Sequence, residues 1–223
     1  MDWLDYLPPL MKGAWVTVQL AVYSTVLGGI FSFAFGMGKL ASNRALQAFS
    51  IAVIEFFRGT SLLVQLFWLY FALPLLGQSL GVDLRLPPVL AGVLALSLNI
   101  GAYGAEVVRG ALQAVPREQT EAAQALDFTP KQILWRIRLP QAVPEMMPSF
   151  GNLAVQNLKD TALVSLVGLS DLAFRAEQIR NITQDNTTIY TLLLLMYFGM
   201  ALVLTLCMKL LERSVGRWRS GGT

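Results

Sequence analysis

Four long stretches of the chain contain no charged residue, and they constrain its fold more than any other feature. They cover residues 13–38, 59–82, 86–105 and 186–208, which makes them 26, 24, 20 and 23 residues long. A helix of about 20 apolar residues, rising about 1.5 Å per residue, crosses the roughly 30 Å hydrocarbon core of a bilayer. Each stretch is therefore long enough to span a membrane. This excludes an ordinary soluble domain, and also a transmembrane β-barrel, whose strands alternate polar and apolar residues.

The composition excludes several kinds of functional site. Only 14% of residues are charged, against about 25% in globular proteins. The chain has no histidine and one cysteine, Cys207, which excludes imidazole metal sites, histidine bases, an intrachain disulfide and multi-cysteine metal sites. The net charge of +3 does not indicate nucleic acid, because the positive residues lie in segments between spans. We expect an all-α, polytopic membrane protein that binds no metal or cofactor of its own.

The expected organisation is a single transmembrane domain, residues 1–223, with about five spans. The spans are expected at about 13–37, 49–75, 88–109, 141–168 and 187–208. The fourth lacks a long charge-free run, but Asn152, Gln156 and Lys159 recur at helical spacing, as expected of a helix that lines a polar interior. The first run is far longer than the apolar part of a secretory signal, so we interpret it as a retained span.

The distribution of basic residues predicts the orientation of these spans. With the N-terminus outside, the inner segments hold eleven Lys and Arg residues and the outer segments hold four. Positive residues concentrate in cytoplasmic segments. We therefore expect the N-terminus outside, the C-terminus inside, and residues 110–139 in the cytoplasm.

The stretch of residues 110–139 carries two predicted short helices. Pro116 can open the first, which is expected to run to about Leu126. Thr129-Pro130-Lys131-Gln132 is typical of a capping box that opens the second, and we expect Pro140 to end it after Leu139. This stretch also carries three apolar side chains that we expect to be exposed: Leu126, Phe128 and Trp135. Exposed apolar side chains mark a partner surface. The alternative is that the stretch is a connector packed on its own membrane helices.

Four segments resemble one known family. Residues 121–127 (EAAQALD) with 137–142 (IRLPQA) resemble the EAA loop of inner-membrane permeases of ABC importers, most closely those of the polar amino-acid uptake family. The segments 57–65 (FRGTSLLVQ), 103–110 (YGAEVVRG) and 159–165 (KDTALVS) resemble that family's second, third and fourth spans, in the same order. One such motif would be weak, but four in order over residues 55–170 are a strong indication.

The resemblance implies that residues 110–139, here called the coupling loop, hold a coupling helix that docks on a cytoplasmic ATPase. The family usually has glycine where Asp127 stands; aspartate tolerates a left-handed backbone better than most residues, so we expect the same turn. The resemblance implies coupling roles for Glu121, Ala122, Ala123, Leu126, Asp127, Phe128, Leu139 and Pro140.

The resemblance also implies the partners of the chain. They are a second permease subunit, identical or homologous, two cytoplasmic ABC ATPase subunits, and an extracytoplasmic solute-binding protein at a bacterial inner membrane. Residues 36–39 (GMGK) look like part of a phosphate loop but lack its first glycine and its Ser or Thr. ATP and Mg²⁺ are therefore expected on the ATPase.

Polar residues at membrane depth are the predicted solute path or gate. Charged side chains there cost about 2.5–3.5 kcal/mol on insertion scales and usually face a bundle interior. On one continuous second helix, Glu55, Arg58 and Gln65 would lie within about 80° of each other. The alternatives are an ion pair between Arg58 and Glu106 and interhelical hydrogen bonds for the uncharged residues. The path residues are Arg58, Gln65, Asn99, Tyr103, Glu106, Gln156, Lys159 and Asp160.

The sequence thus predicts a transport subunit, not an enzyme. Its expected cargo is an amino acid or a related polar zwitterion, with ectoine as the alternative within the family. Two other classes remain open: an ATP-independent channel or secondary carrier, and a membrane scaffold without a transported solute.

Overall fold

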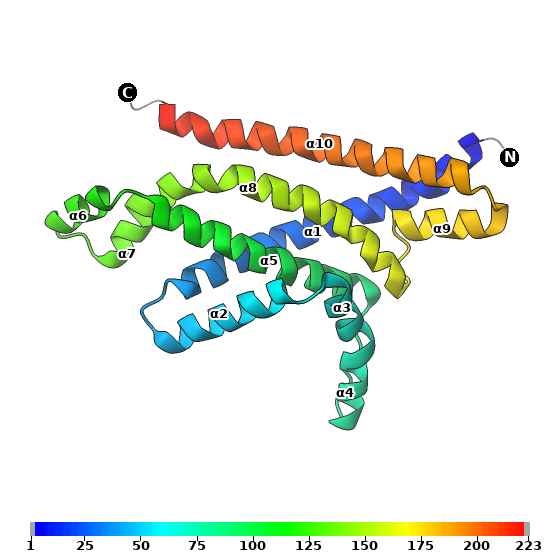
Figure 1. Ribbon diagram of the computed structural model, residues 1–223, viewed down its shortest axis with the longest axis horizontal. Coiled ribbons are helices and arrows are strands. Elements are labelled where there is room, and N and C mark those ends of the chain that lie inside the picture. The colour runs from blue at the N-terminus through cyan, green and yellow to red at the C-terminus, as the bar shows by residue number, and fades with distance from the viewer. Residues whose placement is uncertain (1–2, 221–223) are drawn as a thin grey trace.

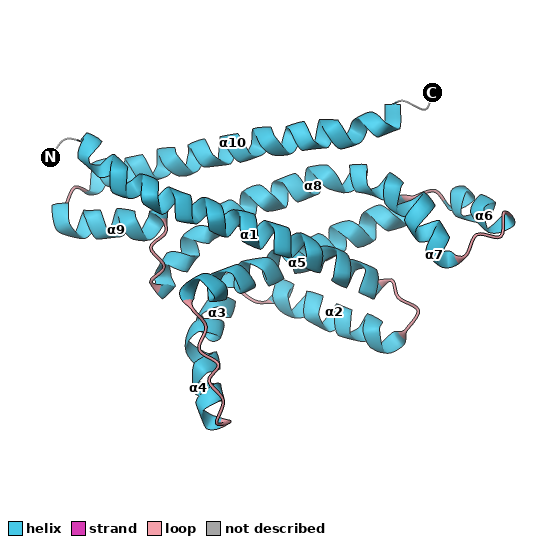
Figure 2. Cartoon of the chain, turned by 180° about the vertical axis from the view of Figure 1, so that it is seen from behind, coloured by secondary structure: helices cyan, strands magenta, loops and turns pink. Residues whose placement is uncertain are grey.

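The computed structural model describes residues 3–220, and these residues form helices and connecting loops without a strand (Figure 1; Figure 2). This confirms the all-α class. The elements in chain order are η1 (Trp3–Tyr6), α1 (Leu7–Lys39), α2 (Arg44–Gly59), α3 (Leu62–Phe67), the π-helical η2 (Trp68–Ala72), α4 (Leu73–Ser79), α5 (Pro88–Ala114), α6 (Arg117–Ala125), α7 (Pro130–Gln132), the π-helical η3 (Ile133–Arg138), α8 (Leu139–Asp160), the 3₁₀ helix η4 (Thr161–Val167), α9 (Leu172–Thr183) and α10 (Asn186–Ser220).

Four helical segments within residues 3–220 are long and apolar enough to cross a membrane. They are Leu7–Lys39, Leu62–Ser79, Pro88–Ala114 and Asn186–Val215, and each overlaps one of the charge-free runs. The segment expected to be the fourth span corresponds to α8, which carries two internal prolines and is not among these four. The count of five spans stays a prediction.

The segment expected as one span over 49–75 is not one helix. Helix α2 ends at Gly59, and α3 begins at Leu62 after two residues, Thr60 and Ser61, with extended backbone. Glycine weakens a helix, and serine is favoured at the position just before one. The break places Glu55 and Arg58 on one helix and Gln65 on another, so the expected common helical face does not exist.

Pro140 does not end a helix as expected. The chain stays helical from Pro130 to Asp160, and Pro140 lies in the first turn of α8, directly after η3. A proline ring clashes with the carbonyl four residues earlier in an α-helix. The wider π-helical turn over Ile133–Arg138 changes the hydrogen-bond spacing there, and it therefore accommodates the proline without a break.

Helices α1 and α5 share the most extensive helix–helix interface of the described chain. Their backbones approach closely because small residues face each other. A methyl group added at Gly36 would lie 2.8 Å from the carbonyl oxygen of Ala105 and 2.9 Å from Val108. Such small-residue contacts are the usual way for helices to associate inside a membrane, where apolar burial gives little drive.

The two ends of the bundle carry different parts of the chain. The C-terminal end of α10 lies near α6 and α7 at one end, while the N-terminal end of α1 lies near α9 at the other (Figure 1). This arrangement fits the predicted sidedness, in which the coupling loop and the C-terminus share a side. The segment α3–η2–α4, here called the arm, projects away from the bundle in both views (Figure 1; Figure 2).

We predict that Gly36→Ala destabilises the protein by about 1–3 kcal/mol, the usual effect of overpacking a tight contact. The clash is with the backbone carbonyl oxygen of Ala105 and the β-carbon of Val108, neither of which can move aside as the end of a flexible side chain can. The measurement is reversible unfolding by SDS titration from mixed micelles. Gly29→Ala on the same helix is the matched control, since its added methyl group meets nothing within 4 Å. Equal stability of the two variants would contradict the close α1–α5 contact.

Candidate functional site

A cavity of about 410 Å³ lies where the beginning of the arm meets α5 and the end of α8. It contains four of the predicted path residues: Asn99 and Tyr103 on α5, and Gln156 and Asp160 on α8, more than 50 positions later in the sequence. The full lining is Thr60, Ser61, Leu62, Asn99, Ile100, Tyr103, Leu153, Gln156, Asn157 and Asp160.

The polar groups of this cavity are mostly hydrogen-bond acceptors and hydroxyls. The Nε2 atom of Gln156 donates to Oδ1 of Asp160 at 3.0 Å, one helical turn away. Among the described lining residues, Asp160 is the one charged side chain. The wall also has apolar parts from Leu62, Ile100 and Leu153. Such a lining can receive a small solute that carries both a cationic and an apolar group.

Lys159 does not line the cavity, although it is adjacent to Asp160. It is exposed, since successive helical residues point about 100° apart. The cavity face of α8 consists of Leu153, Gln156, Asn157 and Asp160. The expected polar face through Asn152 and Lys159 is therefore rotated away from the cavity.

Gln65 is buried beside the cavity and holds the α2–α3 break in place. Its Nε2 atom donates to the carbonyl oxygens of Phe57 at 2.9 Å and Thr60 at 3.2 Å, and to Oγ1 of Thr60 at 2.8 Å. These carbonyls lie at the end of α2, where helices leave acceptors without a partner. Gln65 thus fixes Thr60, a residue of the cavity wall, and does not itself line the cavity.

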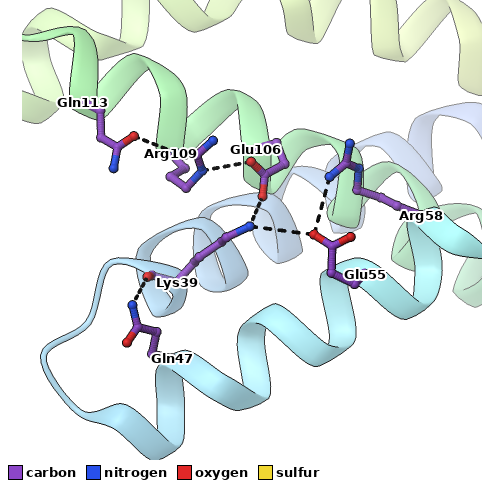
Figure 3. Close-up of polar contacts among 7 residues, drawn as sticks. All are labelled: Lys39, Gln47, Glu55, Arg58, Glu106, Arg109 and Gln113. Atoms are coloured by element: carbon purple, nitrogen blue, oxygen red, sulfur yellow. Dashed lines mark hydrogen bonds and ion pairs between the residues drawn. The ribbon is translucent and has the colours of Figure 1, made fainter.

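Arg58 and Glu106 do not pair with each other, contrary to the simple ion-pair alternative. Glu106 contacts Lys39 at 2.5 Å and Arg109 at 2.8 Å, whereas Arg58 lies 3.8 Å from Glu55 (Figure 3). Lys39 joins the two pairs, since its Nζ is 3.9 Å from Glu55. We call these five residues the ion-pair chain; it connects α1, α2 and α5.

The ion-pair chain reaches the cavity at one end and the coupling loop side at the other. The guanidinium carbon of Arg58 lies 5.6 Å from the centre of the Tyr103 ring, within the range of a cation–π contact. At the other end, Nη1 of Arg109 donates to Gln113 at 2.6 Å (Figure 3). The predicted path residues Arg58 and Glu106 are therefore joined to the cavity wall by contacts and are not part of its lining.

Asn157 is a cavity residue that the sequence analysis missed. Its Nδ2 atom donates to three acceptors on α1, which are the carbonyl oxygen of Ala21 at 3.3 Å, Oγ of Ser24 at 2.7 Å and Oγ1 of Thr25 at 2.9 Å. The only signal in the sequence was that Asn157 lies on one amphipathic helix, while Ser24 and Thr25 lie in an otherwise apolar helix.

Asp171 was also missed. It lies between the expected fourth and fifth spans, is fully buried, and accepts the Phe174 backbone N–H at 2.9 Å, which caps α9. Burial raises the pKa of the Asp171 carboxyl to about 6. The next residue, Leu172, donates its backbone N–H to Thr17 on α1 at 3.1 Å. This junction fixes α9 against α1.

The coupling loop has the predicted turn. Asp127 adopts the left-handed conformation with φ of 58°. The backbone N–H of Phe128 donates to Ala123 at 3.1 Å and that of Asp127 to Gln124 at 3.0 Å, the pattern of a Schellman cap. The capping box of Thr129 and Gln132 is also present.

The loop residues divide into an outer and an inner set. Leu126 is 71% exposed and Trp135 53% exposed, and Glu121, Ala122 and Asp127 are exposed as well. Ala123 is buried within the chain. Phe128 and Leu139 are partly buried, and Pro140 is exposed.

Comparison with known proteins decides the family. Residues 24–217 match the family described as the inner membrane component of binding-protein-dependent transport systems. The chain belongs to this family. It is 66% identical over 219 residues, covering 98% of this chain and 92% of the relative, to a probable amino-acid ABC transporter permease protein, y4tF, of Sinorhizobium fredii (strain NBRC 101917 / NGR234).

Two further relatives support the same assignment. A putative glutamine transport system permease protein, GlnP, of Rickettsia conorii (strain ATCC VR-613 / Malish 7) is 32% identical over 92% of both chains. A solved structure described as an amino acid ABC transporter with histidines is 31% identical, with a TM-score of 0.85 over 96% of this chain and 99% of that one. The family resemblance inferred from four short motifs is thereby confirmed.

We predict that Lys39→Met lowers the free energy of unfolding by about 1–3 kcal/mol, because it leaves the partly buried Glu106 with one cationic partner instead of two. Glu55→Gln is the matched control; the Glu55 side chain is 60% exposed, and exposed pairs contribute about 0–1 kcal/mol. SDS titration of both variants measures the difference. A Lys39→Met protein as stable as the parent would show that the pair does not hold α1 to α5.

We also predict that Asp127→Gly protects the end of α6, whereas Asp127→Val exposes it. A left-handed backbone costs an L-residue about 1–2 kcal/mol, and glycine avoids that cost. The measurement is hydrogen–deuterium exchange of peptides covering residues 117–128, in nanodiscs. Asp83→Val, in the exposed loop before α5, is the control and leaves this exchange unchanged. Faster exchange in Asp127→Gly than in the parent would contradict the prediction.

Proposed function

We propose that this permease is a subunit of an ATP-driven importer for amino acids or related zwitterions, and that the cavity between the arm, α5 and α8 lies on the solute path. The observation that carries the proposal is the cavity itself, with its polar and singly charged lining inside a member of this transport family. The names of two relatives, which refer to amino acids and glutamine, support the cargo class.

The chemistry of the lining suits a zwitterion. The Asp160 carboxylate attracts an ammonium group, while the hydroxyl groups of Ser61 and Tyr103 can donate to a carboxylate. Leu62 and Leu153 offer apolar contact to a side chain. Ectoine, which also carries both charges, is the second cargo that this lining fits.

The proposal requires partners. A subunit of this size does not enclose a path alone, so a second permease subunit, identical or homologous, completes it. The exposed apolar side chains of the arm, among them Val64, Trp68 and Leu75, suit a membrane or a second permease. Two ATPase subunits bind ATP and Mg²⁺, and a solute-binding protein delivers the cargo at the outer face of a bacterial inner membrane.

The route of coupling follows from chain continuity. Helix α6 packs against η3, and η3 continues without a break into α8, whose far end carries Asp160. Arg138 ties this segment to α5, because its Nη2 donates to the carbonyl oxygen of Leu112 at 2.6 Å. Closure of the ATPase pair would therefore move the coupling loop and the cavity wall together, which opens the path outward; release inward follows hydrolysis.

The test is uptake of a ¹⁴C-labelled mixture of the twenty L-amino acids by proteoliposomes that contain the complete transporter. We predict that Leu126→Ser weakens ATPase association about 10–100-fold, since burying a leucine contributes about 1.5–3 kcal/mol, and that uptake falls in proportion. The control for ATPase association is Ile182→Ser, on α9 at the other end of the bundle. Ile182 is 83% exposed, against 71% for Leu126.

Deletion of residues 118–138 separates the competing functions. The importer proposal requires that ATPase association and ATP-dependent uptake are both lost. If both survive, the importer proposal is wrong. Uptake that needs no ATP would favour a channel or secondary carrier. If the complete transporter takes up no labelled solute and hydrolyses no additional ATP in its presence, a scaffold role is favoured.

A further inference from the structure

The amide of Asn157 is held in one orientation by α1. Its three acceptors include the backbone carbonyl of Ala21, which can accept but never donate a hydrogen bond. If the amide were turned over, its oxygen would face that carbonyl without a donor between them. The NH₂ group must therefore point toward α1, and the side-chain oxygen must point away from it.

The Asn157 oxygen is available to a solute. Among residues 3–220, no donor lies within hydrogen-bonding distance of Oδ1, yet this atom is not one of the polar side-chain atoms that are buried without a partner. The residue as a whole is 3% exposed and its side chain lines the cavity, so the surface that Oδ1 keeps faces the cavity. Asp160 follows one turn later on the same face, with one of its two oxygens bound by Gln156.

We propose that Asn157 determines specificity: its fixed carbonyl oxygen and the Asp160 carboxylate together form a paired acceptor for a primary ammonium group. This inference rests on the proposed function. A primary ammonium has three N–H donors and can bind both oxygens, whereas a trimethylated ammonium has none. Attraction to the Asp160 charge alone would not distinguish the two, so the distinction depends on directional acceptors.

The paired acceptor gives the cavity a selectivity that a negative charge alone would lack. It favours α-amino acids over the corresponding betaines, although both are zwitterions of similar shape. Because α1 holds the amide before the solute arrives, little ordering is needed on binding, and the oxygen acts as a preorganised acceptor.

The experiment uses the complex of permease and ATPase in nanodiscs without the solute-binding protein, whose own selectivity would mask that of the cavity. Binding of a ¹⁴C-labelled mixture of the nineteen common amino acids that have a primary α-amine, all but proline, is displaced by the same mixture unlabelled, or by its α-N-trimethyl counterpart. The ratio of the two displacement constants is the readout. A purely structural role for Asn157 would weaken both displacements equally and leave the ratio unchanged.

We expect the parent complex to prefer the primary amines, and Asn157→Leu to lower that preference about tenfold, the effect of losing one hydrogen bond to a charged group. Asn152→Leu, an exposed asparagine of the same helix outside the cavity, should keep the ratio. Should Asn157→Leu fail to assemble, the smaller Asn157→Ser, which also lacks the amide oxygen, carries the same expectation.

The outcomes separate the two proposals. If the parent complex binds no labelled amino acid while it retains the ATPase, the proposed solute path through this cavity is wrong, and the inference fails with it. If the parent complex binds amino acids but shows no preference, or if an Asn157 variant keeps the full preference, only the paired acceptor is overturned.

Discussion

The close contact between α1 and α5 is the constraint on which the rest of the structure depends. Glycine on α1 lets the two backbones meet where a side chain would hold them apart. Because α5 is fixed there, Asn99 and Tyr103 form one wall of the cavity and Glu106 reaches Lys39. The same α1 supplies the acceptors that orient Asn157 on the opposite wall. The close contact between α1 and α5 therefore sets the distances between polar groups on α1, α5 and α8.

Features that depend on neighbouring residues in the sequence could be predicted. The charge-free runs indicated apolar helices, because a span needs length and an absence of charge and little else. The capping box at Thr129 and the left-handed turn at Asp127 were also predictable, since both are set by hydrogen bonds within a few residues. Two of the cavity's polar residues, Asn99 and Gln156, were found simply because amides are rare at membrane depth.

Features that depend on packing between distant segments could not be predicted. Glu106 has Lys39 as a partner only because α1 and α5 run side by side, and a helical wheel of either helix cannot show this. The break at Thr60 invalidated a helical wheel that assumed one continuous α-helix. The π-helical turn over Ile133–Arg138 kept the chain helical through Pro140, where an end was predicted. Asn157 was overlooked for the same reason, because its role is defined by acceptors more than 130 positions earlier in the chain.

The π-helical turn has a consequence for how this segment can change in evolution. Each α-helical residue turns the chain by about 100°, so the number of residues between the coupling loop and α8 sets the rotational phase between them. A π-helical turn holds one residue more than an α-helical turn, so a one-residue deletion in Ile133–Arg138 would restore ordinary α-helical spacing and leave the phase between Leu126 and α8 nearly unchanged. The same deletion in the regular α-helical part of α8 would instead rotate the coupling loop by about 100°, so Ile133–Arg138 is where this segment can change its length.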